Sequence, residues 1–368
     1  MKLAIIGASV GQLPICLKAK EMGLETHCFA WDKGAVCKEV VDFFHPISIT
    51  EKDIIVEKCR ELHIDGVVSN ASEFTAEVSA YVAEKLGLNG TQYSVLEQLH
   101  NKFFVRELSK KVEELSSPIF YKYEGADLNL YPCVVKPCNG CAKQGVSFVD
   151  NPDDFVGAIQ YAQESSNCDI IIEEYIVGKE LSIESISYKN KHQIIQITDK
   201  DSSAAPHFVE LGHHQPAEIS DTLKAKIKKV IPNLLTTIGY TNGASHIEVK
   251  YNEDNIYLIE VNLRGGGDDI SNKLVQMSSG YDYLRCMIEV ALDIFQQPQR
   301  VSEPTFAGIY YLCKQTENLL PFFEQSVGEE WYVEGAVYSR NLQISYSNYE
   351  RDGYLIYNSD HKITPYIL

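Results

Sequence analysis

The sequence predicts an α/β domain at the start of the chain, followed by an α+β unit and a small C-terminal β subdomain. Three observations predict this arrangement. Strands alternate with helices in the first part of the chain, antiparallel strand pairs and helices follow in the middle, and the segment after Pro304 is rich in strands. The 368 residues are enough for two or three domains at ~100–200 residues each. We place the domains at about residues 1–95, 96–300 and 301–368.

The first domain is predicted to begin with a strand, a glycine turn and a helix. Leu3–Ile6 is a short apolar run, and apolar residues recur at helical spacing over residues 13–22. Gly7 and Gly11 lie between them. A series of this kind crosses over in the right-handed sense and gives a parallel sheet. The two glycines with Asp32 also allow a nicotinamide-binding interpretation, but the Gly-x-Gly-x-x-Gly fingerprint is absent.

The rest of the chain mixes helices with antiparallel strands. Hydrophobic periodicity predicts helices over residues 92–112, 155–165, 220–238 and 281–295. It predicts central strands over residues 132–137, 169–172, 181–188, 193–199, 246–251 and 256–264. The C-terminal strands are expected at 307–313, 331–337, 343–346 and 353–357.

The charge balance excludes several classes of partner. Lys and Arg number 33 against 51 Asp and Glu, and the net charge of −18 repels nucleic acid and anionic lipid.

No apolar run reaches the ~18 residues that span a bilayer, and the first residues lack the pattern of a signal peptide. Ten cysteines without such a signal indicate a reducing compartment. We therefore expect a cytoplasmic protein that acts on small molecules.

Two carboxylates and an amide gather on one face of the predicted 246–264 hairpin. Glu260 and Asn262 share a face because side chains alternate along a strand. If the connecting loop has an odd length, Glu248 lies opposite Glu260. Like charges in that position destabilise a sheet, and a Mg²⁺ ion with oxygen ligands would offset them. The alternative is a solvated polar face on an edge hairpin.

A lysine ends an apolar strand directly before a glycine-bearing loop. Lys136 supplies a point charge, and Gly140 and Gly145 let backbone amides approach phosphate groups. The loop lacks the Gly-Lys-Ser/Thr ending of a Walker motif. Lys102 is a second candidate for a phosphate contact. Either lysine alone is equally consistent with a solvent-exposed side chain.

The apolar run 170–178 breaks into a linker that can hold an adenine ring. Backbone groups of such a linker pair with the adenine edge, Glu173 is placed to accept from the exocyclic amine, and Glu180 from ribose hydroxyls. The alternative is that Glu173 and Glu174 begin a solvent-exposed loop.

Taken in order, these motifs resemble the ATP-grasp superfamily of carboxylate–amine ligases. The resemblance is carried by residues 101–102, 135–137, 173–180, 246–248 and 260–264. Each motif alone is weak, but the ordered set is specific, and it spans nearly the whole chain. The resemblance implies a Rossmann-like pre-ATP-grasp domain followed by an ATP-grasp fold, with a lid at about residues 132–180.

The resemblance also implies which residues contact the nucleotide. They are Lys102 and Lys136 for the phosphates, Glu173 with the backbone of Glu174 and Ile176 for adenine, and Glu180 for ribose. Lys143 stands where many relatives carry a serine. It either replaces that phosphate contact or points to solvent.

Metal and catalytic residues follow from the same resemblance. Two Mg²⁺ ions, with Mn²⁺ as a substitute, would be held by Glu248, Glu260 and Asn262. Arg264 would steady the transferred phosphate or a substrate carboxylate. The resemblance assigns catalytic roles to Arg264, Lys136 and His246.

The segment 207–216 and the glycines after Arg264 resemble the L-amino-acid (dipeptide) ligase branch of the superfamily. Glu210 would receive a substrate ammonium, and Arg264 would face a carboxylate. Gly266 and Asp268 belong to a run whose backbone amides approach an oxyanion. The histidines that would shape the pocket or move protons are His213, His214 and His246. The alternative is a polar surface loop.

The implied reaction is ATP-dependent formation of an amide bond. A carboxylate attacks the γ-phosphate, and an amine, from a second amino acid in the closest branch, attacks the resulting acylphosphate. The alternatives are a different acceptor, as in glycinamide-type ligases and biotin-type carboxylases, and a non-catalytic nucleotide-binding protein. Members of the superfamily are often dimers, so the resemblance allows a homodimer.

Overall fold

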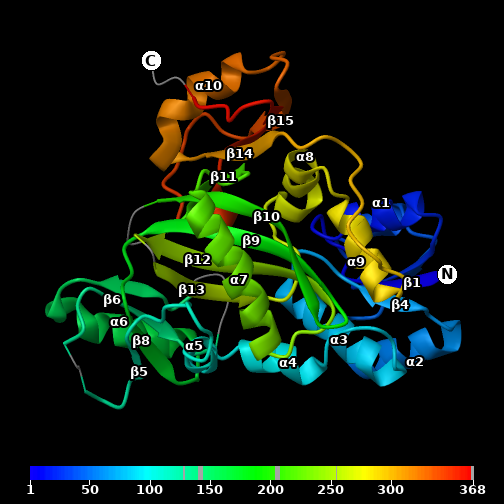
Figure 1. The fold of residues 1–368 in the computed structure, drawn as a ribbon, viewed down its shortest axis with the longest axis horizontal. Helices are drawn as coiled ribbons and strands as arrows, with labels where there is room; N and C mark the ends of the chain where they lie inside the picture. Colours follow the sequence, from blue (N-terminus) through cyan, green and yellow to red (C-terminus); the bar gives the residue numbers. More distant parts are fainter. Residues whose placement is uncertain (127–128, 140–143, 204–207, 254, 366–368) are drawn as a thin grey trace.

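The computed structural model describes residues 1–126, 129–139, 144–203, 208–253 and 255–365. Within these residues the named strands form three sheets (Figure 1). The N-terminal sheet lies at the right of the view, the largest sheet in the centre, and a smaller sheet at the lower left. The α/β domain at the start of the chain and the α+β architecture after it are both confirmed.

The N-terminal sheet is parallel, with strand order β3-β2-β1-β4. Its strands are β1 (Lys2–Ile6), β2 (Glu25–Phe29), β3 (Phe43–His45) and β4 (Gly66–Val68). Its helices are α1 (Leu13–Glu21), η1 (Val36–Glu39), α2 (Lys52–Leu62) and α3 (Glu73–Leu86). The turn after β1 requires a glycine, because Gly7 has φ +91° and a Cβ there would lie 3.0 Å from the Gln12 and Thr75 side chains.

The large sheet is antiparallel, with order β13-β12-β9-β10-β11-β14-β16-β15. Its central strands are β9 (Lys179–Tyr188), β10 (Lys191–Ser202), β11 (Glu210–Gln215), β12 (Gly243–Asn252) and β13 (Asn255–Asn262). The C-terminal strands are β14 (Phe306–Leu312), β15 (Tyr332–Val337) and β16 (Gly353–Ser359). Since β14 pairs with β11, the strand-rich tail extends this sheet and adds no separate sheet.

The third sheet forms a lobe of its own beside the large sheet (Figure 1). Its strands are β5 (Phe120–Lys122), β6 (Cys133–Pro137), β7 (Ser147–Val149) and β8 (Ile170–Glu174), in the order β5-β8-β6-β7. Helix α6 (Pro152–Ser165) packs on it through Phe155, Ile159 and Ala162. This lobe, from Phe120 to Glu174, overlaps the segment at about residues 132–180 that we expect to be a lid.

Two helices replace the single one predicted over residues 92–112. They are α4 (Tyr93–Leu99) and α5 (Lys102–Ser109). The break lies at Asn101, whose side chain accepts a hydrogen bond from the Phe104 backbone amide at 3.1 Å and caps α5. An N-cap residue has a non-helical backbone and ends the preceding helix. The apolar periodicity continues across Asn101, so it could not show the boundary between the two helices.

Helix α7 (Asp221–Thr237) covers one face of the large sheet (Figure 1). Its residues Ile227, Ile231 and Leu234 share a buried cluster with Ile247 and Val249 of β12. Alternate residues of these strands therefore face away from α7, and they are largely polar. The remaining helical segments are η2 (Ile270–Leu274), α8 (Val275–Ser279), α9 (Tyr283–Ala291), η3 (Lys314–Leu319), α10 (Leu320–Gln325) and η4 (Asn348–Glu350). Among the helices of the described residues, none has the length and apolarity to cross a membrane.

Candidate active site

The β12–β13 hairpin places Glu248 directly opposite Glu260, by a different route from the one expected. The turn is even, because Asn252 pairs with Asn255, and regular pairing from there would set Glu248 opposite Ile259. A β-bulge between Glu248 and Val249 shifts the register by one residue. The bulge absorbs Ile259, so both carboxylates point to the polar face while the apolar residues on either side stay in the core.

The acidic pair, Glu248 and Glu260, is suited to binding a cation. Among the described residues, the Glu260 carboxylate takes part in no hydrogen bond or ion pair, and the buried side-chain nitrogen of Asn262 has no partner. Burial and the neighbouring Glu248 raise the pKa of Glu260 above its usual range. Carboxylate and amide oxygens are ligands that Mg²⁺ prefers, and a divalent ion here would relieve the repulsion. These three residues therefore fit the metal that the hairpin pattern predicts.

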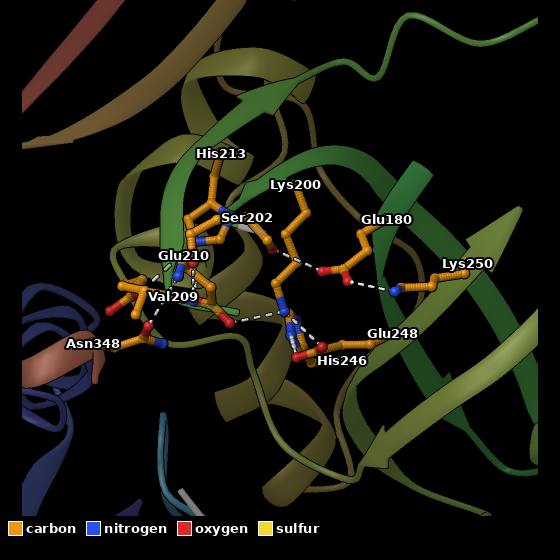
Figure 2. Close-up of polar contacts among 12 residues, drawn as sticks. Glu180, Lys200, Ser202, Val209, Glu210, His213, His246, Glu248, Lys250 and Asn348 are labelled. Atoms are coloured by element: carbon orange, nitrogen blue, oxygen red, sulfur yellow. Dashed lines mark hydrogen bonds and ion pairs between the residues drawn. The ribbon is translucent and has the colours of Figure 1, made fainter. Parts of the chain in front are cut away.

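Glu248 also contacts Lys200 and His246 (Figure 2). The Lys200 ammonium lies 2.5 Å from one carboxylate oxygen, and the His246 Nε2 lies 3.3 Å from the other. Burial alone would raise the pKa of Glu248, but Lys200 and His246 reverse the effect and hold it well below its usual range. Glu248 is therefore ionised throughout the neutral range.

His246 links the metal pair to a buried glutamate. Its Nδ1 contacts Glu184, the cross-strand partner on β9, and Glu184 also accepts a hydrogen bond from the Gly266 amide at 3.1 Å. Burial would lower the pKa of His246, but Glu184 and Glu248 raise it to about 9. His246 is thus an imidazolium at neutral pH. A Cβ on Gly266 would lie 2.9 Å from both Glu184 and His246, so only glycine fits there.

Lys136 and Glu173 form a buried ion pair in the third sheet, joined by a residue that the sequence did not single out. The Lys136 ammonium lies 2.7 Å from Glu173, and the Arg106 guanidinium lies 2.9 Å from the other oxygen of the same carboxylate. Burial opposes the charge, yet Arg106 and Lys136 lower the pKa of Glu173 to about 2. Both of its oxygens are thus committed to cations. The expected contact of this side chain with adenine would have to compete with them.

The cluster of Lys136, Glu173 and Arg106 also changes the pKa of Lys136 and connects two sheets. Burial lowers the pKa of Lys136 to about 8, against the opposing effect of Glu173. Arg106 donates in addition to the Ile259 carbonyl of the bulge at 3.2 Å. Helix α5 is therefore tied both to the third sheet and to the hairpin that carries the acidic pair. Lys102, at the start of α5, is close enough to influence both the Lys136 and Glu260 charges. Lys143 lies outside the described residues.

The linker after β8 runs beside the edge of the large sheet. The Glu174 amide bonds to the Ile119 carbonyl at 2.8 Å, and the carbonyl of Ile176 accepts from the Lys250 ammonium at 3.3 Å. Lys250 also lies 3.3 Å from Glu180, which accepts from the Ser202 hydroxyl at 2.8 Å (Figure 2). The expected adenine and ribose residues are thus neighbours.

A second cluster of charged groups surrounds His213 on β11. Its Nε2 lies 3.4 Å from Glu210 and 3.6 Å from Asp268, although its ring nitrogens have no well-aligned hydrogen bond with the described residues. Glu210 also pairs with Lys200 at 2.8 Å, and Arg351 holds both oxygens of Asp268 at 2.8 and 2.9 Å. The ligand atoms of Glu210, His213 and Asp268 lie close enough together to hold a metal ion. Both carboxylates of this cluster have a cationic partner, however, whereas Glu260 of the acidic pair has none among the described residues.

His214 and Arg264 differ from the other predicted substrate residues. His214 faces the opposite side of β11, with its Nδ1 3.1 Å from the Tyr357 hydroxyl and its Nε2 3.2 Å from Asp201. The structure therefore does not bring it to the polar face, because neighbouring strand residues alternate. Arg264 lies at the border with the N-terminal domain, donating to the Gly265 carbonyl at 2.9 Å and 3.7 Å from Glu73.

Five charged residues of this region were not predicted from the sequence. Lys250 stands on the predicted strand 246–251, and Lys200 directly follows the predicted strand 193–199. A lysine on a buried strand is rare and would have been a signal. No comparable signal marked the others, because their partners come from distant parts of the chain. The five are Arg106, Glu184, Lys200, Lys250 and Arg351.

Comparisons with known proteins agree with this arrangement. Residues 129–273 match the ATP-grasp domain family model. The ATP-grasp enzyme fsqD of Aspergillus fumigatus is 24% identical over 68% of this chain, which spans 50% of that enzyme's length. The formate-dependent phosphoribosylglycinamide formyltransferase of Prochlorococcus marinus is 20% identical over 95% of both chains. The L-amino acid ligase structure from Bacillus licheniformis has a TM-score of 0.78 at 22% identity, over 97% of this chain and 92% of that one.

Proposed function

We propose that this chain, whose residues 129–273 match the ATP-grasp domain family, is an ATP-dependent ligase that joins an amino-acid carboxylate to an amine. The observation that carries the proposal is the acidic pair. Glu248 and Glu260 are brought onto one face by a bulge, with Asn262 beside them and the Glu260 carboxylate without an ion-pair partner among the described residues. Like charges in this position destabilise a sheet, and a bound cation would offset the repulsion.

In this proposal Glu248, Glu260 and Asn262 hold Mg²⁺, which supplies Lewis acidity and neutralises phosphate charge. Lys102 and Lys136 contribute further positive charge to the phosphates of ATP. Phosphoryl transfer needs little besides positioning and charge neutralisation, so residues of this type suffice. Glu173 then serves to orient Lys136, because both its oxygens are held by cations.

The nucleotide base and sugar are proposed to lie along the linker after β8. The backbone of Glu174 and Ile176 would hold the adenine edge, and Glu180 would accept from ribose hydroxyls. Lys250, which touches both the Ile176 carbonyl and Glu180, would fix their spacing. The third sheet, which carries Lys136 on β6, would act as the lid that excludes water from an acylphosphate.

The amino-acid substrates are proposed to bind beyond the metal, between Arg264 and the His213 cluster. Arg264 would face a carboxylate, and Glu210 the ammonium of a substrate. Backbone amides near Gly266 and Asp268 would approach the oxyanion that forms when the amine attacks. His246, an imidazolium at neutral pH, would add positive charge near the reacting carboxylate.

The direct test is incubation with ATP, Mg²⁺ and amino-acid mixtures, followed by measurement of ADP and of new masses. The expected result is ADP formation that depends on an amino acid, with a product lighter by one water than its two substrates together. ADP formation without any condensed product would contradict the proposal. The matched control is the Glu260→Gln variant, which should form neither.

One observation favours a second class of substrate, in which a small acid other than an amino acid is activated. The formyltransferase from Prochlorococcus marinus matches this chain over 95% of both lengths. The same nucleotide site would then activate formate or bicarbonate. Parallel incubations with formate or bicarbonate in place of amino acids separate the two candidates, because only the favoured acid stimulates ADP release.

A further inference from the structure

Lys200 occupies an unusual position in the large sheet. It stands on β10, and its side chain is 3% exposed. Its ammonium lies 2.5 Å from Glu248 and 2.8 Å from Glu210, and Figure 2 shows it between the two carboxylates. Glu248 is one of the proposed metal ligands, and Glu210 is one of the proposed substrate residues. A single buried lysine therefore joins the two parts of the site.

This lysine carries a permanent charge. Two carboxylates lie within hydrogen-bonding distance of its nitrogen and favour the charged ammonium. A divalent ion approaching Glu248 therefore meets the Lys200 ammonium on one oxygen and the His246 ring near the other.

We propose that Lys200 is a positioning residue that reserves the acidic pair for a metal–nucleotide complex and disfavours a bare divalent ion. The inference rests on the proposed function. A bare ion gains attraction from Glu248 and Glu260 but is repelled by the buried lysine a few ångströms away. A nucleotide phosphate carries negative charge to the same place, so it turns this repulsion into attraction.

The arrangement of the carboxylates supports this role over simple structural pairing. An ammonium that only stabilised Glu248 would need no second acceptor, whereas Lys200 is held by Glu210 as well. Glu210 is itself paired with His213 at 3.4 Å. The lysine is therefore fixed from the side opposite the metal ligands and keeps its position when a cation approaches Glu248.

The test compares Mn²⁺ binding to the full chain, followed by electron paramagnetic resonance, with and without a non-hydrolysable ATP analogue. Lys200→Met removes the charge and keeps the apolar stem, and Lys200→Arg keeps the charge. We expect Lys200→Met to bind bare Mn²⁺ about tenfold more tightly than wild type, and to lose a similar part of the enhancement by the analogue. Lys200→Arg and the control Lys191→Met, at the exposed start of β10, should match wild type.

A second variant keeps the test valid if Lys200→Met fails to fold. Lys200→Met with Glu210→Gln preserves the net charge of the cluster, and it should also bind bare Mn²⁺ more tightly. Unchanged or weaker binding of bare Mn²⁺ in folded variants would overturn the inference while leaving the ligase proposal intact. Failure of the wild type to bind Mn²⁺ even with the analogue would instead overturn the proposed function.

Discussion

At the scale of single residues, the buried Glu173 and the half-buried Glu260 differ in their partners. Glu173 is held by Lys136 and Arg106, and its charge is fully compensated. Glu260 faces Glu248 and has no ion pair among the described residues. A carboxylate that faces a like charge without a cationic partner, as Glu260 does, is rare in proteins unless a bound ligand supplies the missing positive charge. The contrast separates an orienting glutamate from a ligand-binding one.

Glu260→Gln should make the chain more stable and inactive at the same time. Burial and Glu248 raise the pKa of Glu260, so its ionised form destabilises the fold, and this cost develops as the pH rises above the usual pKa of a glutamate. The amide removes this repulsion, and we expect a gain of up to about 1 kcal/mol in the free energy of unfolding at pH 8. ADP formation should fall at least ~100-fold, because a metal ligand is lost.

Chemical unfolding and ADP release measure the two effects of this substitution. Glu253→Gln, exposed in the turn of the same hairpin, is the control and should change neither. A stable variant with undiminished ADP release would show that Glu260 does not bind the metal.

Lys136 should impose an upper pH limit on ATP use. Burial lowers its pKa to about 8 in the free protein, so its positive charge is present below that pH and is lost above it. Accordingly kcat/KM for ATP, which reports groups of the free enzyme, should fall as the pH rises above about 8. Lys136→Arg, whose guanidinium stays charged, should lack this decline while Lys102→Arg keeps it. A pH profile that is the same for wild type and Lys136→Arg would exclude this lysine as the cause.

At the scale of elements, the segment after β13 is shaped by the strands it crosses. Gly266 donates to Glu184 on β9, and Asp268 reaches His213 on β11 and Arg351 near the C-terminus. The three glycines of this segment are not equivalent. A Cβ on Gly266 would contact Glu184 and His246 at 2.9 Å, whereas nothing lies within 4 Å of one on Gly267.

Gly266→Ala and Gly267→Ala form a matched pair. Overpacking at Gly266 should lower the free energy of unfolding by about 1–3 kcal/mol and displace His246. The substitution at Gly267 should cost less than about 1 kcal/mol. Thermal unfolding of both variants, with the ring signals of His246 followed by NMR, checks the prediction. Equal stability of the two variants would mean that the segment shifts without cost.

At the scale of the whole molecule, the C-terminal strands complete the site. They extend the large sheet through β14, and they bring Arg351 onto Asp268, 83 residues away in sequence. The Arg351 guanidinium also lies 3.5 Å from the centre of the Tyr311 ring. The Asn348 side chain accepts from the Glu210 amide at 3.1 Å. Residues 348–351 therefore form one wall around the proposed substrate residues.

Arg351→Met should weaken both the fold and the substrate site. Asp268 would lose its two charge-assisted hydrogen bonds while staying half-buried, which costs on the order of 2 kcal/mol of unfolding free energy. The KM of the amino-acid substrate should rise more than the KM of ATP, because the nucleotide residues lie elsewhere. Steady-state kinetics with each substrate varied in turn measure this difference. The exposed Arg340→Met is the control, and an equal rise in both KM values would argue for a general loss of structure.

The sequence by itself determined the fold class, the parallel N-terminal sheet, the antiparallel hairpins and the grouping of Glu260 with Asn262, because these follow from local periodicity. Tertiary structure decided the rest. The bulge that aligns Glu248 with Glu260 depends on packing against α7, and the break at Asn101 depends on a cap. The ion pairs of Glu173, Lys200 and Asp268 join elements far apart in the chain, and His214 turns away because its neighbour His213 faces the site. The alternation of side chains along a strand determines the face of the sheet on which each one lies. Only the tertiary structure determines which charged groups it contacts.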